Sequence, residues 1–314
     1  MKTIPVAILG TGKIGTDLLI KVIRSSYMHC ACFVGRRDAS EGMAVAREHG
    51  VPTSAGGIDF LCNHPELYDM VFDATSAEAH VSNQKVFARH GKKVFDLTPS
   101  HIGEAAVPAI NPEAVFSAGN INLVSCGGQA ALPILYAISQ ICPNISYMEF
   151  VNTASSRSAG TATRQNLDEY IHTSEAAARK FTGCGKVKAL ALLNPADPPV
   201  HMHTTITVMA GEVDEAKIRE AVLAMVARVQ KYAPGYSILA DPICGSGKVT
   251  VLTRTEGRGD YLEKYAGNLD IINSAAAYLA DVYAIRLLEK RPRAASLQTA
   301  PTGDLYAKRK ISNF

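Results

Sequence analysis

Short apolar runs alternate with stretches of helical periodicity along the first 120 residues. Runs at 4–9, 30–35, 69–75 and 93–98 are apolar and rich in β-branched residues, which predicts buried strands. Apolar residues three or four apart from Leu18 to Ile23, at 41–49 and at 80–90 predict helices between them. Strands alternating with helices predict an α/β fold, a Rossmann-type doubly wound parallel sheet.

Beyond residue 140 the pattern changes to longer strands with fewer helices. We expect strands at 145–153, 188–193, 201–209 and 248–256 and helices at 166–181 and 214–231. This indicates a second α+β domain, an antiparallel sheet packed by helices, of the kind used for catalysis and dimerisation. An apolar helix at 270–289 is expected to return to the first domain.

These patterns divide the chain into three parts. Residues 1–127 with 270–290 form a dinucleotide-binding domain, and 128–269 a catalytic and dimerisation domain. Residues 291–314 form a polar basic tail, either solvated or an interaction arm.

Composition and charge argue against nucleic-acid binding, membrane insertion and secretion. A net charge of +3 is too weak to indicate nucleic-acid binding, and 47% hydrophobic with 19% charged residues is ordinary for a soluble protein. The first strand begins near Ile4, so we expect no signal peptide, and no apolar run approaches the ~20 residues that cross a bilayer. An odd set of 7 cysteines without a CxxC pair indicates reduced thiols and a cytoplasmic protein.

A glycine motif follows the first strand directly: Gly10-Thr11-Gly12-Lys13-Ile14-Gly15. In GxGxxG between strand and helix, the first glycine permits the tight turn. The second lets a pyrophosphate approach the backbone, and the third allows close helix packing. The context predicts NAD or NADP binding, and the alternative is a turn that only packs.

The second predicted strand ends at Arg36 and Arg37. Arginine there suits a 2′-phosphate, which favours NADP or use of both cofactors, unless both side chains point into solvent. Thr75 lies at the end of the predicted strand at 69–75. Because carboxyl ends of parallel strands share one edge, we expect Thr75, Cys126 and the glycine motif to line one crevice.

Residues 121–139 hold the main candidate for chemistry. An apolar run up to Val124 predicts a strand, and Pro133 followed by apolar residues at helical spacing predicts the start of a helix. Cys126 at the turn would face free helix amides, which favours loss of the thiol proton. Gly127 and Gly128 would let a substrate carbonyl reach sulfur and backbone amides together, as an oxyanion site. The alternative is a buried cysteine without a catalytic role.

Seven stretches together resemble one family, the acylating acetaldehyde dehydrogenases of aromatic meta-cleavage pathways, over most of residues 4–290. They are GTGKIGTDLL (10–19), VFDATSAEAH (71–80), DLTP (96–99), CGGQAALPI (126–134), NPADPP (194–199), YAPGY (232–236) and YAGNLDI (265–271). The resemblance implies that Cys126 carries the acyl thioester, with coenzyme A as cosubstrate. It further implies a homodimer partnered with a 4-hydroxy-2-oxovalerate aldolase.

The resemblance also implies cofactor contacts outside the glycine motif. These would come from the 158–166 loop and from Asn268. The loop residues are Ser158, Ala159, Gly160, Thr161, Arg164 and Asn166.

Three positions depart from the family pattern. Thr161 and Ala162 replace a Pro-Gly pair, Thr204 stands near a usual acidic residue, and Arg36-Arg37 replaces Ile-Asp. The departures bear on substrate size, on any polar partner of the thiol and on cofactor choice.

Three functional classes fit these observations. The first is a CoA-acylating aldehyde dehydrogenase for a short aliphatic aldehyde, with acetaldehyde the favoured substrate. The second is a phosphorylating semialdehyde dehydrogenase, and the third a non-catalytic cofactor-binding partner of an aldolase. We expect no metal site: His201 and His203 share a strand face, but no third ligand is identifiable.

Overall fold

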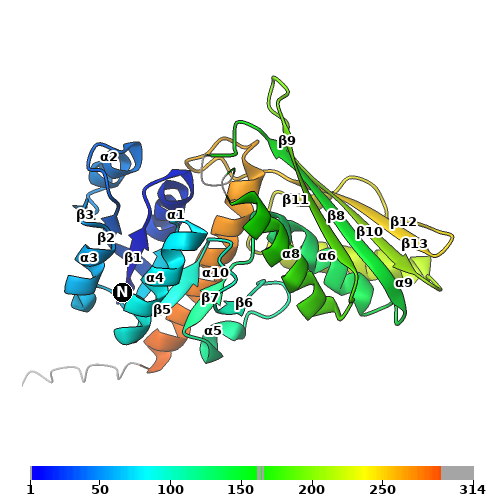
Figure 1. Ribbon diagram of the computed structural model, residues 1–314, viewed down its shortest axis with the longest axis horizontal. Coiled ribbons are helices and arrows are strands. Elements are labelled where there is room, and N and C mark those ends of the chain that lie inside the picture. The colour runs from blue at the N-terminus through cyan, green and yellow to red at the C-terminus, as the bar shows by residue number, and fades with distance from the viewer. Residues whose placement is uncertain (1, 161–163, 165, 291–314) are drawn as a thin grey trace, which may run out of the picture.

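Two β-sheets with helices packed around them form the protein (Figure 1). The computed structural model describes residues 2–160, 164 and 166–290. The first sheet has seven strands in the order β3-β2-β1-β4-β5-β7-β6, and each neighbouring pair is parallel. Its strands are β1 (Ile4–Leu9), β2 (Met28–Val34), β3 (Thr53–Ser54), β4 (Met70–Asp73), β5 (Lys93–Asp96), β6 (Glu104–Ala105) and β7 (Asn120–Asn122). The predicted Rossmann-type doubly wound sheet is confirmed.

Helices cover both faces of this sheet. Ile8 of β1 packs in one apolar cluster with Leu18 of α1, whereas the adjacent Leu9 packs in a second cluster with Phe87 of α4. Burial on both faces explains why these strands are continuous apolar runs rather than alternating ones. The helices and turns of this half are α1 (Lys13–Arg24), α2 (Glu41–Glu48), α3 (Gly57–Asn63), η1 (Pro65–Leu67), α4 (Ala77–Arg89) and α5 (Ala114–Ser117).

The second sheet has six strands, with the path β11-β13-β10-β8-β9 and β12 beside β13. Its elements are β8 (Ile145–Ser155), α8 (Leu167–Thr182), β9 (Val187–Asn194), β10 (Met202–Ala210), α9 (Glu215–Gln230), β11 (Tyr236–Ile238), β12 (Ile243–Gly245) and β13 (Lys248–Thr255). The expectation of an antiparallel sheet is wrong for one pair, because β8 and β9 are parallel. Helix α8 joins them as a crossover, and such a connection returns the chain in the same direction.

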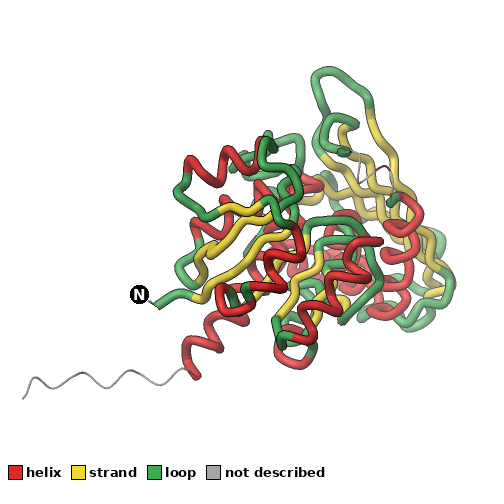
Figure 2. The backbone as a smooth tube through the Cα atoms, turned by 60° about the vertical axis from the view of Figure 1, so that its left-hand side comes forward, coloured by secondary structure: helices red, strands yellow, loops and turns green. Residues whose placement is uncertain are grey.

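Helix α6 (Cys126–Ser139) packs against α8, α9, α10 and the second sheet. Figure 2 shows the helices of the molecule in red beside the strands in yellow. Helix α6 begins earlier than Pro133 suggested. The Ser125 side chain caps the helix by accepting the Gly128 amide at 2.8 Å, so Pro133 lies inside it. The cap therefore sets the helix start.

Helix α10 (Gly267–Lys290) links the two halves of the molecule. The helix, drawn in orange in Figure 1, packs against α1, α5 and β1 of the first half and against α6 and β13 of the second half. By length and composition alone it could cross a membrane, against our expectation, but half of its most apolar window is buried in the protein. Core helices of soluble proteins share these properties, so the evidence for a membrane span is weak. The three-part domain division stays a prediction.

A buried lysine ties α10 to α1. Lys21 Nζ lies 3.2 Å from Asp17, 2.9 Å from Asp260 and 2.7 Å from Asp270. Burial lowers the pKa of Lys21, but the surrounding carboxylates outweigh it and leave the pKa raised. The lysine is therefore charged and holds together segments from distant parts of the chain.

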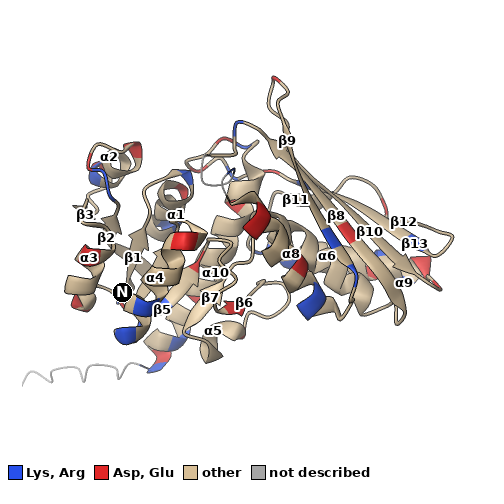
Figure 3. Cartoon of the chain, in the orientation of Figure 1, with Lys and Arg blue, Asp and Glu red and all other residues tan. Residues whose placement is uncertain are grey.

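Charged side chains are spread over both halves of the molecule. Among the described residues, Lys and Arg are interspersed with Asp and Glu rather than gathered in one stripe (Figure 3). This distribution matches the small net charge of +3.

Candidate active site

Cys126 lies at a sharp turn between a strand and a helix. It is the first residue of α6, four residues after β7 ends, and its side chain is half-buried. Val124 in the turn has a φ of 63°, a conformation that a β-branched residue rarely adopts. The Val124 amide donates to Asn122 Oδ1 at 2.9 Å, which helps to hold the turn. Strain of this kind is typical of positions whose geometry serves a function.

Gly127 and Gly128 are required by close packing. A Cβ on Gly127 would lie 1.8 Å from the Tyr170 hydroxyl oxygen and 2.1 Å from Asn152 Nδ2. A Cβ on Gly128 would lie 2.8 Å from Val124 Cγ1. The Gly128 amide already donates to Ser125, so of the two amides expected to bind an oxyanion, only that of Gly127 faces the sulfur.

The Cys126 thiol is less acidic than its place at a helix N-terminus suggested. Burial raises its pKa to about 11, although the Tyr170 hydroxyl and the Gly127 amide, both close to the sulfur, lower it. The expectation of easy proton loss is therefore wrong for the protein alone, because removing the thiolate from water outweighs the local donors.

A chain of neutral hydrogen-bonding groups leads to this sulfur. Thr204 Oγ1 of β10 donates to Asn152 Oδ1 of β8 at 2.8 Å, and Asn152 Nδ2 donates to the Tyr170 hydroxyl of α8 at 3.2 Å. All three side chains are buried. We call Thr204, Asn152 and Tyr170 the neutral chain. Asn152 and Tyr170 are not predicted from the sequence, since neither stands in a recognised motif.

The glycine motif has the geometry that a dinucleotide needs. Gly10 has a φ of 115°, and a Cβ there would lie 2.5 Å from the Ala74 carbonyl oxygen. A Cβ on Gly15 would lie 1.9 Å from the Gly10 oxygen, whereas around Gly12 there is open space. A pyrophosphate can therefore approach the backbone at Gly12 and the N-terminus of α1.

A cleft of about 410 Å³ opens beside this motif. It is lined by Thr11, Gly12, Lys13, Thr16, Arg37, Ala39, Ser40, Glu41, Gly42 and Tyr261. Arg37 thus faces the cleft, while the Arg36 side chain lies beside Gly57 outside this lining. Ile14 is half-buried against the core, and its carbonyl accepts from Asn273 at 3.1 Å.

The loop after β8 meets the glycine motif. Lys13 Nζ donates to the Arg157 carbonyl at 3.0 Å, and Arg164 donates to Ser156 Oγ at 2.9 Å. Ser158 and Ala159 are buried, Gly160 is exposed and Asn166 precedes α8 as its N-cap residue. Thr161 lies outside the described residues.

Asn268 supplies an unpaired polar atom. It lies in the first turn of α10 and is 3% exposed. Its amide oxygen has no hydrogen-bond partner within the part of the chain that the structure describes. A buried acceptor without a partner is costly, which fits a position that pairs with a bound ligand.

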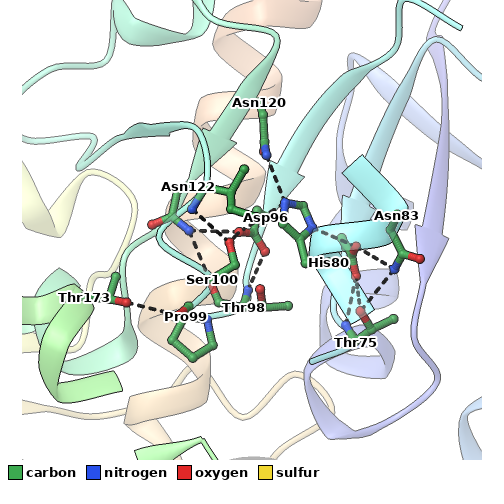
Figure 4. Close-up of polar contacts among 12 residues, drawn as sticks. Thr75, His80, Asn83, Asp96, Thr98, Pro99, Ser100, Asn120, Asn122 and Thr173 are labelled. Carbon is green, nitrogen blue, oxygen red and sulfur yellow. Dashed lines mark hydrogen bonds and ion pairs between the residues drawn. The ribbon is translucent and has the colours of Figure 1, made fainter. Parts of the chain in front are cut away.

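A buried charged cluster lies at the carboxyl ends of β4 and β5 (Figure 4). His80 Nδ1 is 2.9 Å from Asp73 and Nε2 is 3.4 Å from Asp96, the last residues of these strands. Asp73 also accepts from the Thr75 amide at 3.1 Å, so the cluster fixes the predicted site residue Thr75. We call Asp73, His80 and Asp96 the charged cluster.

The charged cluster also holds the turn after β5, which contacts α8. Asp96 accepts from the Thr98 amide at 2.8 Å and from Ser100 Oγ at 2.6 Å. The Pro99 carbonyl between them accepts from Thr173 of α8 at 3.0 Å. The cluster therefore sits between the turn after β4 and the helix that carries Tyr170.

Burial controls the titration of the cluster. It raises the pKa of Asp96 to about 6, against the His80 charge and hydrogen bonds from Ser100 and Thr98. Burial would lower the pKa of His80, but the Asp73 hydrogen bond and both carboxylate charges outweigh it and raise the pKa. A role for His80 is not predicted from the sequence, although the two aspartates that end adjacent parallel strands are a usable signal for it.

The two histidines singled out in the sequence have other neighbours than the charged cluster. His201 Nδ1 contacts the Lys264 carbonyl at 3.3 Å, and burial with the charge of Arg254 lowers the pKa of His203. Among the described residues, no group of three His, Cys, Asp or Glu side chains could hold a metal ion.

Two family models match the chain. Residues 5–118 match the semialdehyde dehydrogenase NAD-binding domain, and residues 126–263 match the dimerisation domain of prokaryotic acetaldehyde dehydrogenase. The first match agrees with the glycine motif and its cleft, and supports NAD(P) binding by this half. The second covers Cys126 and the neutral chain.

Curated relatives match almost the whole chain. An acetaldehyde dehydrogenase of Burkholderia pseudomallei (strain 668) is 48% identical over 88% of this chain and 93% of its own length. That of Spirochaeta aurantia is 44% identical over 90% and 95%, and that of Pectobacterium atrosepticum 46% over 90% and 96%.

Two solved structures share the fold. Aspartate semialdehyde dehydrogenase with NADP from Candida albicans has a TM-score of 0.62 at 11% identity, covering 88% of this chain and 100% of that one. Aspartate semialdehyde dehydrogenase II from Vibrio cholerae has a TM-score of 0.59 at 15% identity, covering 93% and 100%. At these identities the likeness concerns the fold alone.

Proposed function

The chain belongs to the acetaldehyde dehydrogenase family, and on that premise we propose that it converts a short aliphatic aldehyde to an acyl-CoA through Cys126. The family resemblance noted in the sequence is confirmed, and the protein is an aldehyde dehydrogenase. The observation that carries the proposal is the position of Cys126. The residue lies at a strained strand-to-helix turn, and the Tyr170 hydroxyl and the Gly127 amide both favour its thiolate.

In the proposed reaction, the Cys126 thiolate attacks the aldehyde carbon and forms a thiohemiacetal. The Gly127 amide would donate to the oxygen that becomes negative. A nicotinamide cofactor, when bound, would accept the hydride, which would leave the acyl group on the Cys126 sulfur as a thioester. The thiol of coenzyme A then attacks this thioester, and Cys126 leaves as a thiolate.

The cofactor proposal rests on the glycine motif and its cleft. Thr11, Gly12 and Lys13 would hold the phosphates, and Arg37 at the cleft would accept a 2′-phosphate. Asn268 would pair with the cofactor through its free amide oxygen. We expect NADP to be used at least comparably to NAD, with kcat/KM for both cofactors as the measurement. A strong preference for NAD would show that Arg37 does not select the cofactor.

Substrate and partner proposals follow from the resemblance. The two departures from the family pattern, Thr161 and Ala162, follow Arg157, whose carbonyl accepts from Lys13 at 3.0 Å. In a pocket for the acyl group, each methylene is worth about 1–3 kcal/mol of discrimination. We propose a short aliphatic aldehyde, with acetaldehyde favoured, delivered by a 4-hydroxy-2-oxovalerate aldolase in the cytoplasm. The dimerisation-domain match supports a homodimer. Turnover rates for aldehydes of two to six carbons test the proposed substrate, and the same rates with an added aldolase test the proposed partner.

The deciding experiment is Cys126→Ser. We expect turnover with an aldehyde, NAD(P) and coenzyme A to fall to background while cofactor binding survives, and intact-mass analysis of the native enzyme to find acyl adducts on Cys126. An adduct on one of the other cysteines, or near-normal turnover of the variant, contradicts the assignment. Replacing coenzyme A by phosphate separates acylating from phosphorylating chemistry, and no turnover with any aldehyde would favour the non-catalytic alternative.

A further inference from the structure

The hydrogen bonds of the neutral chain all run in one direction, from Thr204 through Asn152 to Tyr170. A tyrosine hydroxyl holds one proton and two lone pairs, and an amide has a donor end and an acceptor end. Because Thr204 donates to Asn152 Oδ1, the Asn152 NH₂ group is turned toward Tyr170 and donates to its oxygen. The other polar groups beside the Tyr170 hydroxyl are the Cys126 sulfur, the Ser125 side chain and the Gly127 amide. The amide N–H cannot accept the Tyr170 proton, and the Ser125 oxygen already accepts from Gly128 at 2.8 Å, which favours the sulfur as the acceptor.

From this direction we propose that Tyr170 is a further catalytic residue, which donates a hydrogen bond to the Cys126 sulfur and stabilises it as a thiolate. Asn152 and Thr204 are positioning residues that keep the tyrosine proton aimed at the sulfur. The inference rests on the proposed function only in taking Cys126 as the nucleophile.

The surroundings of the sulfur make this donor important. Burial raises the pKa of Cys126. Within the described residues, the groups that lower it are the Tyr170 hydroxyl and the backbone amides of Gly127 and Cys126. The donors are neutral, and in a site shielded from water a neutral donor stabilises an anion more than it does in water. Tyr170 is thus the one side-chain donor among these groups.

The hydroxyl remains a donor throughout the reaction. Burial raises the pKa of Tyr170 well above its usual range, so the phenol stays protonated and the thiol proton goes to solvent instead. The thioester sulfur carries no negative charge and needs the donor little. When coenzyme A displaces Cys126, the sulfur leaves as an anion and the same hydrogen bond stabilises the leaving group.

Packing around Gly127 supports this arrangement. The Tyr170 oxygen and Asn152 Nδ2 fill the place of the missing side chain, 1.8 and 2.1 Å from where a Cβ would lie. The Ser174 hydroxyl, one helical turn along α8, donates to the Tyr170 carbonyl at 2.6 Å and contacts Ser125 Oγ at 2.6 Å. The helix that carries the tyrosine is therefore joined directly to the cap of the helix that carries the cysteine.

The test measures the thiol without cofactor or substrate. In Tyr170→Phe, iodoacetamide should alkylate Cys126 about tenfold more slowly at pH 8, since a hydrogen bond to a charged group is worth about 1.5–3 kcal/mol and one pKa unit corresponds to 1.36 kcal/mol. Peptide mass spectrometry reports Cys126 separately from the other six cysteines. Tyr147→Phe is the matched control, because its hydroxyl binds Glu149 at 2.7 Å on the second sheet.

The positioning residues have their own outcome. Thr204→Val should slow alkylation about threefold, and in the double variant with Tyr170→Phe it should add nothing, because it acts through the tyrosine. Additive effects would overturn the positioning role. Thr204→Val also keeps the test valid if Tyr170→Phe does not fold, since an unchanged rate there overturns the proposed chain.

Failure of this inference differs from failure of the proposed function. An unchanged alkylation rate in folded Tyr170→Phe rejects the tyrosine while Cys126 acyl adducts still support the nucleophile. Near-normal turnover of Cys126→Ser rejects the nucleophile whatever Tyr170 does. Near-ultraviolet circular dichroism and cofactor binding establish that each variant is folded.

Discussion

Two buried polar networks lie on either side of the turn after β5, and they differ in charge. The charged cluster of Asp73, His80 and Asp96 has its side chains 0% exposed, and its carboxylates accept hydrogen bonds from backbone amides and neighbouring side chains. The neutral chain carries no charge and ends on Cys126, which is half-buried. One network is closed on itself, whereas the other ends at the half-buried cysteine that we propose as the nucleophile.

The difference in charge indicates that the two networks have different roles. Buried charges that satisfy one another hold turns rigidly, and losing one partner is expensive. A chain of neutral donors leaves the sulfur uncharged until the reaction ionises it. The charged cluster should therefore control stability, and the neutral chain the reactivity of Cys126.

The largest effect is expected from His80→Leu. Removing the imidazole leaves the Asp73 and Asp96 carboxylates buried near each other, which should lower the free energy of unfolding by about 3–5 kcal/mol. Urea unfolding at pH 7 measures it. Alkylation of Cys126 in the folded variant should remain within twofold of wild type. A stability loss below about 1 kcal/mol, or a large change at the thiol, would break the comparison.

A smaller effect concerns pH. Burial raises the pKa of Asp96 from 3.8 to about 6, so between these values the folded protein binds more protons than the unfolded chain. Stability from this group is present below pH 4 and is lost as pH rises through 6. The free energy of unfolding of wild type minus that of Asp96→Asn should fall by about 2–3 kcal/mol from pH 4 to 7. A flat difference across this range would contradict the raised pKa.

The smallest effect on stability is expected from Gly127→Ala. The new Cβ displaces Tyr170 or Asn152, and overpacking of this kind costs about 1–3 kcal/mol. Its effect on chemistry should be larger in proportion, with Cys126 alkylation and turnover both reduced. Gly119→Ala is the control, because nothing lies within 4 Å of its Cβ. Normal alkylation in Gly127→Ala would show that the neutral chain tolerates displacement.

The fold followed from the sequence because its signals are local. The strands of the first sheet are continuous apolar runs, and Gly10 to Gly15 stand directly between β1 and α1. Cys126 could be placed at a turn for the same reason, since its neighbours predict a strand before it and a helix after it. The catalytic and cofactor roles of these residues stay predictions.

What the sequence hid depends on contacts between distant segments. Tyr170, Asn152 and Thr204 come from α8, β8 and β10, and no spacing rule joins them. The acidity of Cys126 was mispredicted because helix amides are visible in a sequence pattern, whereas loss of solvent is not. The parallel β8–β9 pair escaped notice because alternation along a strand does not report its direction.

The return of α10 has a consequence for synthesis of the protein. Lys21 is translated 249 residues before its partner Asp270, which at roughly 5–20 residues per second is an interval of roughly 12–50 s. Throughout that interval the nascent chain lacks the helix that covers one face of α1, and the lysine has only Asp17 of its three acids. The cofactor half, although encoded first, is therefore completed only when the last described helix leaves the ribosome.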